Sequence, residues 1–248
     1  MQAETLASAY RLWRRNWKGK GREYTAGALV WQVSTSPKLS DIQGIPCDEH
    51  DLLAIALPNI ILTSQSSFSS VFPFPQINDC WPVTSWAIVD YFLRPKPAYF
   101  AIKRELRPYT VGMTRKDEQV FPDALSAARF TIETKIEIWG TNSTLDIKNA
   151  RLEVATFDLA DAEAKPTVFL STDVELAPNA ATELWKGTLP GQPTRTKASE
   201  VPKTIIVSAR LLEKGDGGAV LARYSNWCVP VLFENRGFRF LCCCVASY

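Results

Sequence analysis

The sequence is poor in the residues that build many enzyme sites. Histidine occurs once among 248 residues, as His50, in a stretch rich in Ser and Pro. A single histidine argues against a Ser-His-Asp triad and against a histidine-based metal site. Gly19 and Gly21 lack the further glycines and the strand-to-helix setting of a phosphate-binding loop, so we interpret them as a loop after a helix. We therefore expect no metal and no cofactor.

Charge and cysteine spacing exclude further classes of protein. The 28 basic and 26 acidic residues leave a formal charge of +2, which favours neither a nucleic-acid partner nor an electrostatic membrane anchor. No apolar run reaches the roughly 18 residues that a membrane helix needs. The six cysteines, at 47, 80, 228, 242, 243 and 244, have neither disulfide-framework nor zinc-ligand spacing and indicate free thiols. Without a basic and then apolar leader we expect a cytoplasmic protein, although a truncated start would also have lost a leader.

The first part of the chain has the pattern of helices and buried strands. Apolar residues at three- and four-residue steps predict an amphipathic helix from Gln2 to Trp17. Its apolar stripe consists of Leu6, Tyr10, Trp13 and Trp17, and the rest of the helix carries Arg11, Arg14 and Arg15. Residues 26–31 predict a short strand that is apolar on both faces, as in a buried parallel sheet. Ala98 to Leu106 places Tyr99, Ile102 and Leu106 on one helical face, so the pattern favours α/β.

From about Pro108 the hydrophobic period changes to two. Phe130, Ile132, Ile136 and Ile138 alternate with polar residues, which predicts a half-buried strand. Further strands are predicted at Arg151–Leu159, Thr167–Val174, Thr204–Leu212 and Ala219–Tyr224. Turn signals rich in Asn, Pro and Gly separate them, and such spacing fits an antiparallel sandwich of immunoglobulin type.

An aromatic and amide-rich cluster is the strongest candidate for a binding site. It comprises Trp31-Gln32 and residues 77–86, INDCWPVTSW, on either side of a long insertion. Indole faces stack on the apolar C–H faces of a pyranose, while Asn and Asp hydrogen-bond its hydroxyls. The residue types alone leave two interpretations open, a sugar site and a packed tryptophan core.

The same cluster carries a family resemblance. When residues 33–76 are left out, residues 27–32 and 77–86 join into a segment that resembles the eighth-strand motif of fungal-type β-mannosidases of glycoside hydrolase family 2. Residues 2–4, 10–17 and 90–99 are similar to the same family in the same order.

The resemblance implies a fold in two parts. Residues 1–107 would be the C-terminal remnant of a (β/α)8 barrel, and residues 108–227 an immunoglobulin-like β-sandwich. Retaining glycosidases need two carboxyl groups about 5 Å apart, and the family places them after the fourth and seventh strands, upstream of Met1. Glu4 belongs to the following helix. The chain alone is therefore expected to be inactive, whereas its parent would hydrolyse terminal β-mannosides.

Four residues would form the edge of the sugar pocket. The resemblance implies that Trp31 is a stacking wall at the end of strand eight and that Asn78, Asp79 and Trp81 lie in the loop beside it. Asp79 would be a sugar ligand, a support for one, or a purely structural aspartate. The implied partner is a β-mannoside or manno-oligosaccharide.

Two segments do not fit the family. Val33-Ser34 can be encoded by a GTAAGT that resembles a splice donor, and Gln76 by CAG after pyrimidine-rich codons, so we interpret residues 33–76 as a retained intron. A lid loop is the rival interpretation. Residues 228–248, with three adjacent cysteines, are interpreted as misread sequence.

A second hypothesis of another class remains open. The sandwich could act as a non-catalytic carbohydrate-binding or interaction module, because a fold does not fix a function. Asn142-Ser143-Thr144 is a glycosylation sequon, which matters only in a secreted protein.

Overall fold

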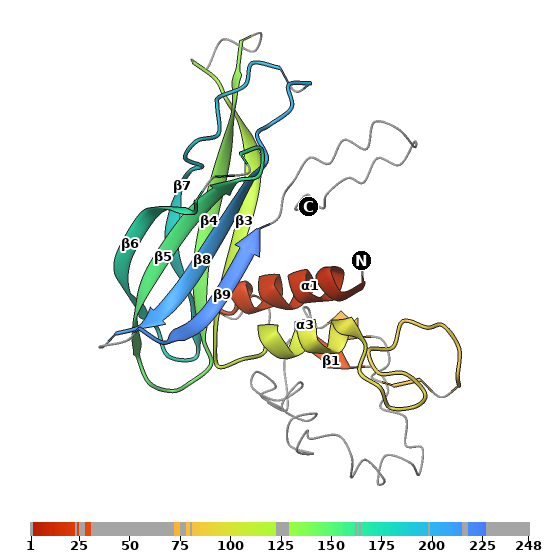
Figure 1. Cartoon of the computed structure of the whole chain (residues 1–248). Coiled ribbons are helices and arrows are strands. Elements are labelled where there is room, and N and C mark those ends of the chain that lie inside the picture. Colours follow the sequence, from red (N-terminus) through yellow and green to blue (C-terminus); the bar gives the residue numbers. More distant parts are fainter. Residues whose placement is uncertain are drawn as a thin grey trace. The chain divides into compact units, whose positions relative to one another are not determined.

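The computed structural model describes residues 2–22, 24, 28–30, 72–74, 78–79, 81–122, 129–161, 163, 165–197, 199–214 and 218–226. The chain divides into two compact units. Unit 1 contains residues 1–110, 141–148 and 176–182, and unit 2 contains residues 111–140, 149–175 and 183–248. Figure 1 labels their helices and strands. The predicted boundaries at 107 and 227 stay predictions.

Unit 1 is built on two helices that pack against each other. α1 spans Gln2–Asn16 and α3 spans Pro97–Glu105. Pro97 suits the first turn of α3, because its fixed φ is helical and its missing N–H would have no intrahelical partner there. The core combines side chains of both helices with two from the loop before α3: Tyr10, Ile88, Val89, Ala98, Tyr99 and Ile102. Both predicted helices are thus confirmed.

The arginines of α1 correct one expectation. The helical period places Arg11 and Arg14 outside the apolar stripe, yet both side chains are buried. Glu105 of α3 is the reason, because its carboxylate pairs with Arg11 and its backbone carbonyl accepts a hydrogen bond from Arg14. A guanidinium can be buried when its donors find partners, and a hydrophobicity pattern does not register this.

A short parallel sheet completes the regular structure described in unit 1. β1, Ala28–Val30, pairs in parallel with β2, Phe72–Phe74, so that Ala28 faces Phe72 and Val30 faces Phe74. β2 falls within residues 33–76, the stretch interpreted as an insertion. The rest of that stretch and residues 228–248 lie outside the described residues. The expected barrel remnant stays a prediction.

Two sheets form the second half of the fold. The three-stranded sheet has the order β3-β4-β7, with β3 at Tyr109–Val120, β4 at Thr131–Asn142 and β7 at Ala180–Thr188. The four-stranded sheet has the order β6-β5-β8-β9, with bounds Thr167–Leu176, Lys148–Asp158, Ile205–Glu213 and Val220–Asn226. β5 and β9 both run antiparallel to β8 and lie on either side of it (Figure 1). This confirms the predicted sandwich of immunoglobulin type.

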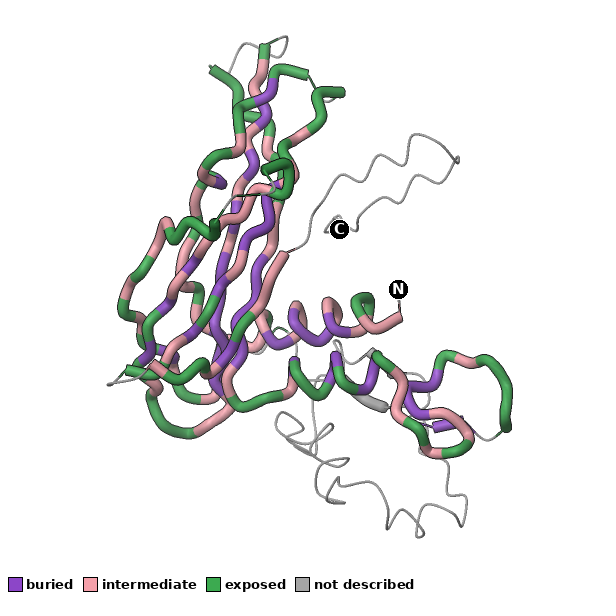
Figure 2. The backbone as a smooth tube through the Cα atoms, in the orientation of Figure 1, coloured by how far each residue is buried: buried purple, intermediate pink, exposed green. Residues whose placement is uncertain are grey.

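Alternating side chains build the core of the sandwich. On β4, Ile132, Ile136 and Ile138 are buried, as the period of two predicts. Leu152 and Val154 of β5 and three residues of β8 are also buried. Figure 2 shows buried stretches, in purple, recurring along the strands. The three residues of β8 are Val207, Ala209 and Leu211.

A close approach of β3 and β4 requires a glycine. A Cβ added at Gly112 would lie 2.5 Å from the ring of Trp139, which is fully buried on β4. Only glycine leaves room for this indole across the neighbouring strand.

Candidate functional site

The predicted site residues do not share one environment. Trp31 lies outside the described residues. Asn78 and Asp79 are buried, whereas Trp81 is 72% exposed. Asn78 forms an isolated parallel bridge with Val89, and the Asp79 N–H donates to the Val89 carbonyl at 3.1 Å. The backbone thus fixes the start of the loop, while the indole that follows two residues later lies at the surface.

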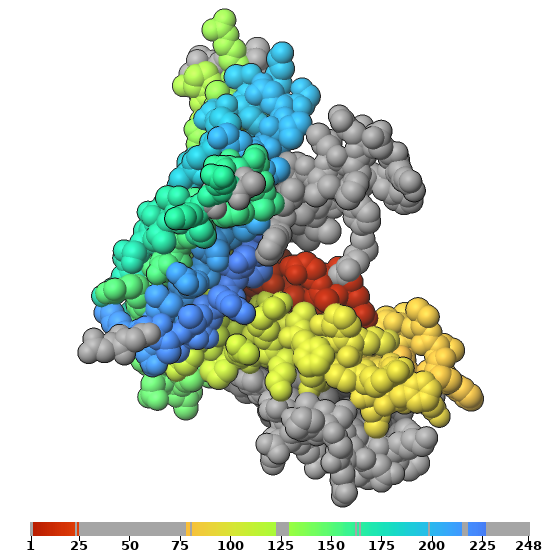
Figure 3. All heavy atoms as spheres, viewed as in Figure 1, coloured from red at the N-terminus to blue at the C-terminus, as the bar shows by residue number. Residues whose placement is uncertain are grey.

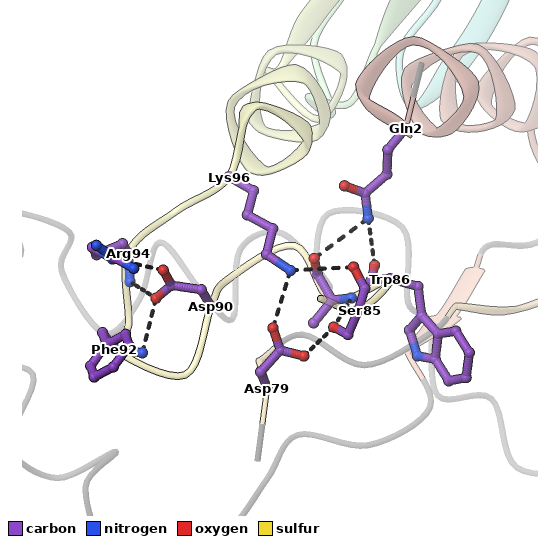
Figure 4. Close-up of polar contacts among 9 residues, drawn as sticks. Gln2, Asp79, Ser85, Trp86, Asp90, Phe92, Arg94 and Lys96 are labelled. Carbon is purple, nitrogen blue, oxygen red and sulfur yellow. Dashed lines mark hydrogen bonds and ion pairs between the residues drawn. The ribbon is translucent and has the colours of Figure 1, made fainter. Parts of the chain in front are cut away.

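The carboxylate of Asp79 is held by two other side chains. Its Oδ1 accepts a hydrogen bond from the Ser85 hydroxyl, and its Oδ2 lies 3.1 Å from the ammonium of Lys96 (Figure 4). Lys96 Nζ also donates to the Ser85 carbonyl at 3.4 Å. A buried carboxylate needs such partners, because desolvation of an unpaired charge is costly. A carboxylate can accept roughly four hydrogen bonds, so these contacts leave room for another donor.

A second set of contacts holds the end of the loop. Gln2 Nε2 of α1 donates to the Trp86 carbonyl at 2.5 Å and to the Ala87 carbonyl at 3.4 Å. The Ser85 hydroxyl accepts from the Ala87 N–H at 3.0 Å. The Trp86 indole points away from this network in Figure 4 and is 66% exposed.

Sequence reasoning placed Ser85 and Trp86 in the aromatic cluster but not among the four site residues, and it did not select Gln2 or Lys96. Ser85 gives a local signal, since a serine hydroxyl often bonds a backbone N–H two residues on. Gln2 and Lys96 give none, because their distance from the loop along the chain hides the contacts. Trp86 was included in the aromatic cluster, but nothing in the sequence distinguishes it from a core tryptophan.

A tight turn follows the loop. Asp90 Oδ1 accepts from the N–H groups of Phe92 and Arg94 at 2.9 Å each, and its Oδ2 accepts from Arg94 Nε at 2.7 Å. Partial desolvation raises the pKa of Asp90, but the hydrogen bonds and charge of Arg94 outweigh it and hold the pKa below its ordinary value. Leu93 adopts a positive φ of 63°, which this network supports.

The other buried carboxylate of the described residues belongs to a structural network. Arg11 donates to Glu105 Oε1 from Nη2 at 2.6 Å and from Nε at 3.2 Å. Arg14 donates to the Glu105 carbonyl, to the Arg107 carbonyl at 2.9 Å and to the Ser143 hydroxyl at 2.6 Å. Burial lowers the pKa of Arg14 to about 10, while the charge of Glu105 opposes this shift. Both Asp79 and Glu105 are therefore engaged by cations rather than presented as a catalytic pair.

Metal ligation and membrane insertion are the remaining properties of the described residues. No group of three or more His, Cys, Asp or Glu side chains within them could hold a metal ion. No helix in the described part of the chain is long and apolar enough to cross a membrane.

The fold and one family model define the class of the second half of the chain. Residues 134–231 match the model described as "Mannosidase Ig/CBM-like domain". Since the two sheets described above cover most of this range, the fold and the match agree on an immunoglobulin-like domain.

Full-length relatives extend the likeness to nearly the whole chain. β-Mannosidase B of Thermothelomyces thermophilus is 34% identical over 235 residues, which cover 95% of this chain and 22% of that protein. β-Mannosidase B of Emericella nidulans is 27% identical over 241 residues, covering 97% and 22%. The resemblance to fungal β-mannosidases is thus confirmed, and the chain spans about a fifth of the length of the curated relatives that it matches.

Solved structures give weaker likenesses. The β-D-mannosidase from Dictyoglomus thermophilum matches with a TM-score of 0.41 and 23% identity over 65% of this chain and 16% of that chain. The exo-chitosanase CsxA from Amycolatopsis orientalis matches with a TM-score of 0.43 and 13% identity over 92% and 18%.

Proposed function

We propose that this chain corresponds to the C-terminal part of a retaining β-mannosidase, which hydrolyses terminal β-D-mannose residues of β-mannosides. The observation that carries the proposal is 34% identity to a β-mannosidase B along 95% of the chain. The two buried carboxylates of the described residues, Asp79 and Glu105, are paired with Lys96 and Arg11, so neither is assigned a catalytic role. The catalytic pair is proposed to lie in the part of the enzyme that precedes Met1.

The proposal assigns the helical unit to the enzyme's barrel. The order of the elements is α1, β1, β2 and α3. Without β2, which lies within residues 33–76, the order helix, strand and helix suits a (β/α)8 remnant over residues 1–107. Residues 33–76 are proposed to be a retained intron and residues 228–248 a misread tail. We also propose that the protein is cytoplasmic.

The sugar pocket of the parent enzyme is proposed to include Trp31, Asn78, Asp79 and Trp81. Trp31 and Trp81 would contact the apolar faces of the substrate. Asp79 would act chiefly by positioning, because Ser85 and Lys96 already use both of its oxygens. Its remaining lone pairs would accept from a sugar hydroxyl only where the loop opens toward the pocket.

Turnover of an aryl β-mannoside tests the proposal. The purified 248-residue chain is expected to give no hydrolysis above the buffer rate, whereas a longer gene product that includes the upstream carboxylates is expected to hydrolyse the substrate. Replacement of either upstream carboxylate by its amide should then abolish turnover. Turnover by the short chain, or none by the longer product, would overturn the assignment.

A further inference from the structure

Two tryptophans differ from the others in their exposure. Of the six tryptophans that the structure describes, Trp81 and Trp86 are exposed, at 72% and 66%, and the remaining four are buried or half-buried. Trp17 illustrates the usual arrangement, since its Nε1 donates to the Asn179 carbonyl at 2.6 Å. An exposed indole leaves a large apolar face in water, which is unfavourable unless something covers it.

The backbone at Trp86 is anchored although its side chain is exposed. Gln2 holds the carbonyls of Trp86 and Ala87, Lys96 holds the carbonyl of Ser85, and the Ser85 hydroxyl links Asp79 to the Ala87 N–H (Figure 4). These contacts come from α1, from the residue before α3 and from within the loop. A group that is fixed before its ligand arrives loses little conformational entropy on binding.

The charges around the loop select a neutral ligand. The four charged residues between positions 79 and 96 form two ion pairs, Asp79 with Lys96 and Asp90 with Arg94. Both cations among these four residues are thus already paired, which favours an uncharged ligand over a phosphate or a carboxylate. Val83 and Thr84 are exposed between the two tryptophans, so the side chains that the loop offers are apolar and hydroxylic. Atoms of this part of the chain, orange in Figure 3, lie at the surface. A pyranose, with one C–H face and a rim of hydroxyls, matches this chemistry.

We propose that Trp86 is a saccharide-stacking residue, whose anchored indole receives the C–H face of a pyranose of a β-linked manno-oligosaccharide. The choice of mannose rests on the proposed function, whereas the choice of a neutral saccharide rests on the loop. Asp79, Ser85, Lys96 and Gln2 act on the ligand through Trp86, by holding its backbone, and are positioning residues.

Saturation-transfer NMR on the 248-residue chain tests the proposal, with β-1,4-mannotriose as the probe. Wild-type protein is expected to saturate the axial C–H protons of one face of a mannose ring more strongly than the protons of its other face. Trp86→Ala should weaken binding roughly ten-fold, which corresponds to about 1.4 kcal/mol. Trp86→Phe keeps an aromatic face and should recover most of the affinity.

Phe100→Ala is the matched control, because Phe100 is an exposed aromatic residue on α3, outside the loop. The affinity of the Phe100→Ala protein for mannotriose should stay within about two-fold of wild type. Gln2→Leu should lie between Trp86→Ala and wild type and should broaden the indole resonance of Trp86, which a side chain without a positioning role would not do.

Equal binding by wild type and Trp86→Ala, or no saturation transfer to mannotriose from wild type, would overturn the proposal. A longer gene product that hydrolyses aryl mannosides while Trp86→Ala leaves mannotriose binding unchanged would overturn the stacking role and keep the enzyme class. If mannotriose binding depends on Trp86 but the longer product hydrolyses no mannoside, the stacking role would stand and the enzyme class would be overturned.

Discussion

At the scale of single residues, the burial of the Asp79 carboxylate decides which role this residue can have in the loop that contains Asn78 and Trp81. The sequence setting of Asp79 left three roles open: a sugar ligand, a support for one, or a purely structural aspartate. Its side chain is 3% exposed and pairs with Lys96, whose side chain is 24% exposed. The residue type indicated a polar contact, but only the fold could bring a lysine 17 positions away to the carboxylate.

Asp79→Ala should lower the free energy of unfolding by about 2 kcal/mol, because Ser85 and Lys96 lose their partner. Lys96→Met should cost less, since the lysine is partly solvated. The double variant should be less than additive by about 1 kcal/mol, as expected for side chains in direct contact. Urea unfolding of the four proteins measures the coupling, and strict additivity would contradict the ion pair.

Burial of the Tyr10 phenol makes the stability of the packed helices α1 and α3 depend on pH in the alkaline range. Desolvation raises the pKa of Tyr10 to about 12 from an ordinary 10.0. A raised pKa in the folded state means that the native protein holds this proton more tightly than the unfolded chain. The resulting stabilisation is complete below about pH 10 and is lost between about pH 10 and pH 12.

Tyr10→Phe should therefore flatten the fall in unfolding free energy between about pH 10 and pH 12, the interval between the two pKa values. Thermal unfolding at several pH values measures this slope. Tyr24→Phe is the control, because Tyr24 is exposed. A slope that is the same in wild type and Tyr10→Phe would show that another group governs alkaline unfolding.

At the scale of elements, the sequence predicted the strongly periodic segments and missed those whose pattern is mixed. The helix at α1, the helix at α3 and the strands β4, β5, β6, β8 and β9 agree with the predicted segments within a few residues. β3 was missed because its second half, from Thr114 to Gln119, is polar on both faces. β7 was missed because Ala180, Ala181 and Gly187 are weak strand formers.

Gly187 shows why composition misleads at β7. A Cβ added there would lie 2.4 Å from the ring of Trp185, whose indole packs edge-on against Phe169 with ring centroids 5.6 Å apart. The glycine lowers the strand propensity of β7 and at the same time makes room for an aromatic contact that stabilises the sheet edge. Only the tertiary structure shows that the second effect prevails.

The C-terminal end of α3 depends on Arg14. Its guanidinium donates to the carbonyls of Glu105 and Arg107, which lie where a helix leaves its last carbonyls without intrahelical partners. Arg14→Lys keeps the charge but concentrates its donors on one atom, so it cannot serve both carbonyls and Ser143. We expect a loss of about 2 kcal/mol in unfolding free energy.

Amide hydrogen exchange separates this role from a general loss of stability. In Arg14→Lys, amides of residues 102–107 should exchange faster than the rest of unit 1 under native conditions. Arg15→Lys is the matched control, because Arg15 is the neighbouring arginine of α1 and is only half-buried. Uniformly faster exchange across unit 1 would contradict a local role at the end of α3.

The sequon of the sandwich is closed by its own hydrogen bonds. Asn142 is 2% exposed, and its Nδ2 donates to the carbonyls of Asp146 at 2.8 Å and Leu176 at 3.3 Å. Its Oδ1 accepts from the N–H and hydroxyl of Thr144. The amide that a glycan would modify is thus committed to the fold.

Asn142→Asp should destabilise the protein by about 2 kcal/mol, because a carboxylate cannot donate to two buried carbonyls. Thermal unfolding at pH 7 measures the loss, and Asn149→Asp, at an exposed position of β5, should leave the midpoint nearly unchanged. An Asn142→Asp protein as stable as wild type would contradict the structural role of the amide.

At the scale of the whole molecule, the short parallel sheet bears on the origin of residues 33–76. β1 is followed by Trp31, the predicted stacking wall, and pairs with β2, which lies inside the stretch interpreted as an intron. A sheet of two three-residue strands leaves most backbone groups at its edges without strand partners, so it cannot be stable by itself. In a barrel, β1 would instead pair with a neighbouring barrel strand on each side.

Sequencing the mature transcript across this stretch decides between the two arrangements. We expect Gln32 to be joined to Ile77, because that junction restores the eighth-strand motif, and we expect the reading frame to continue upstream of Met1. The spliced and extended protein should then be more soluble than the 248-residue chain, since β1 gains partners on both edges. A mature transcript that retains residues 33–76 would make the β1–β2 pair a native feature of a protein without the barrel, and the sandwich would then be the part in which to look for function.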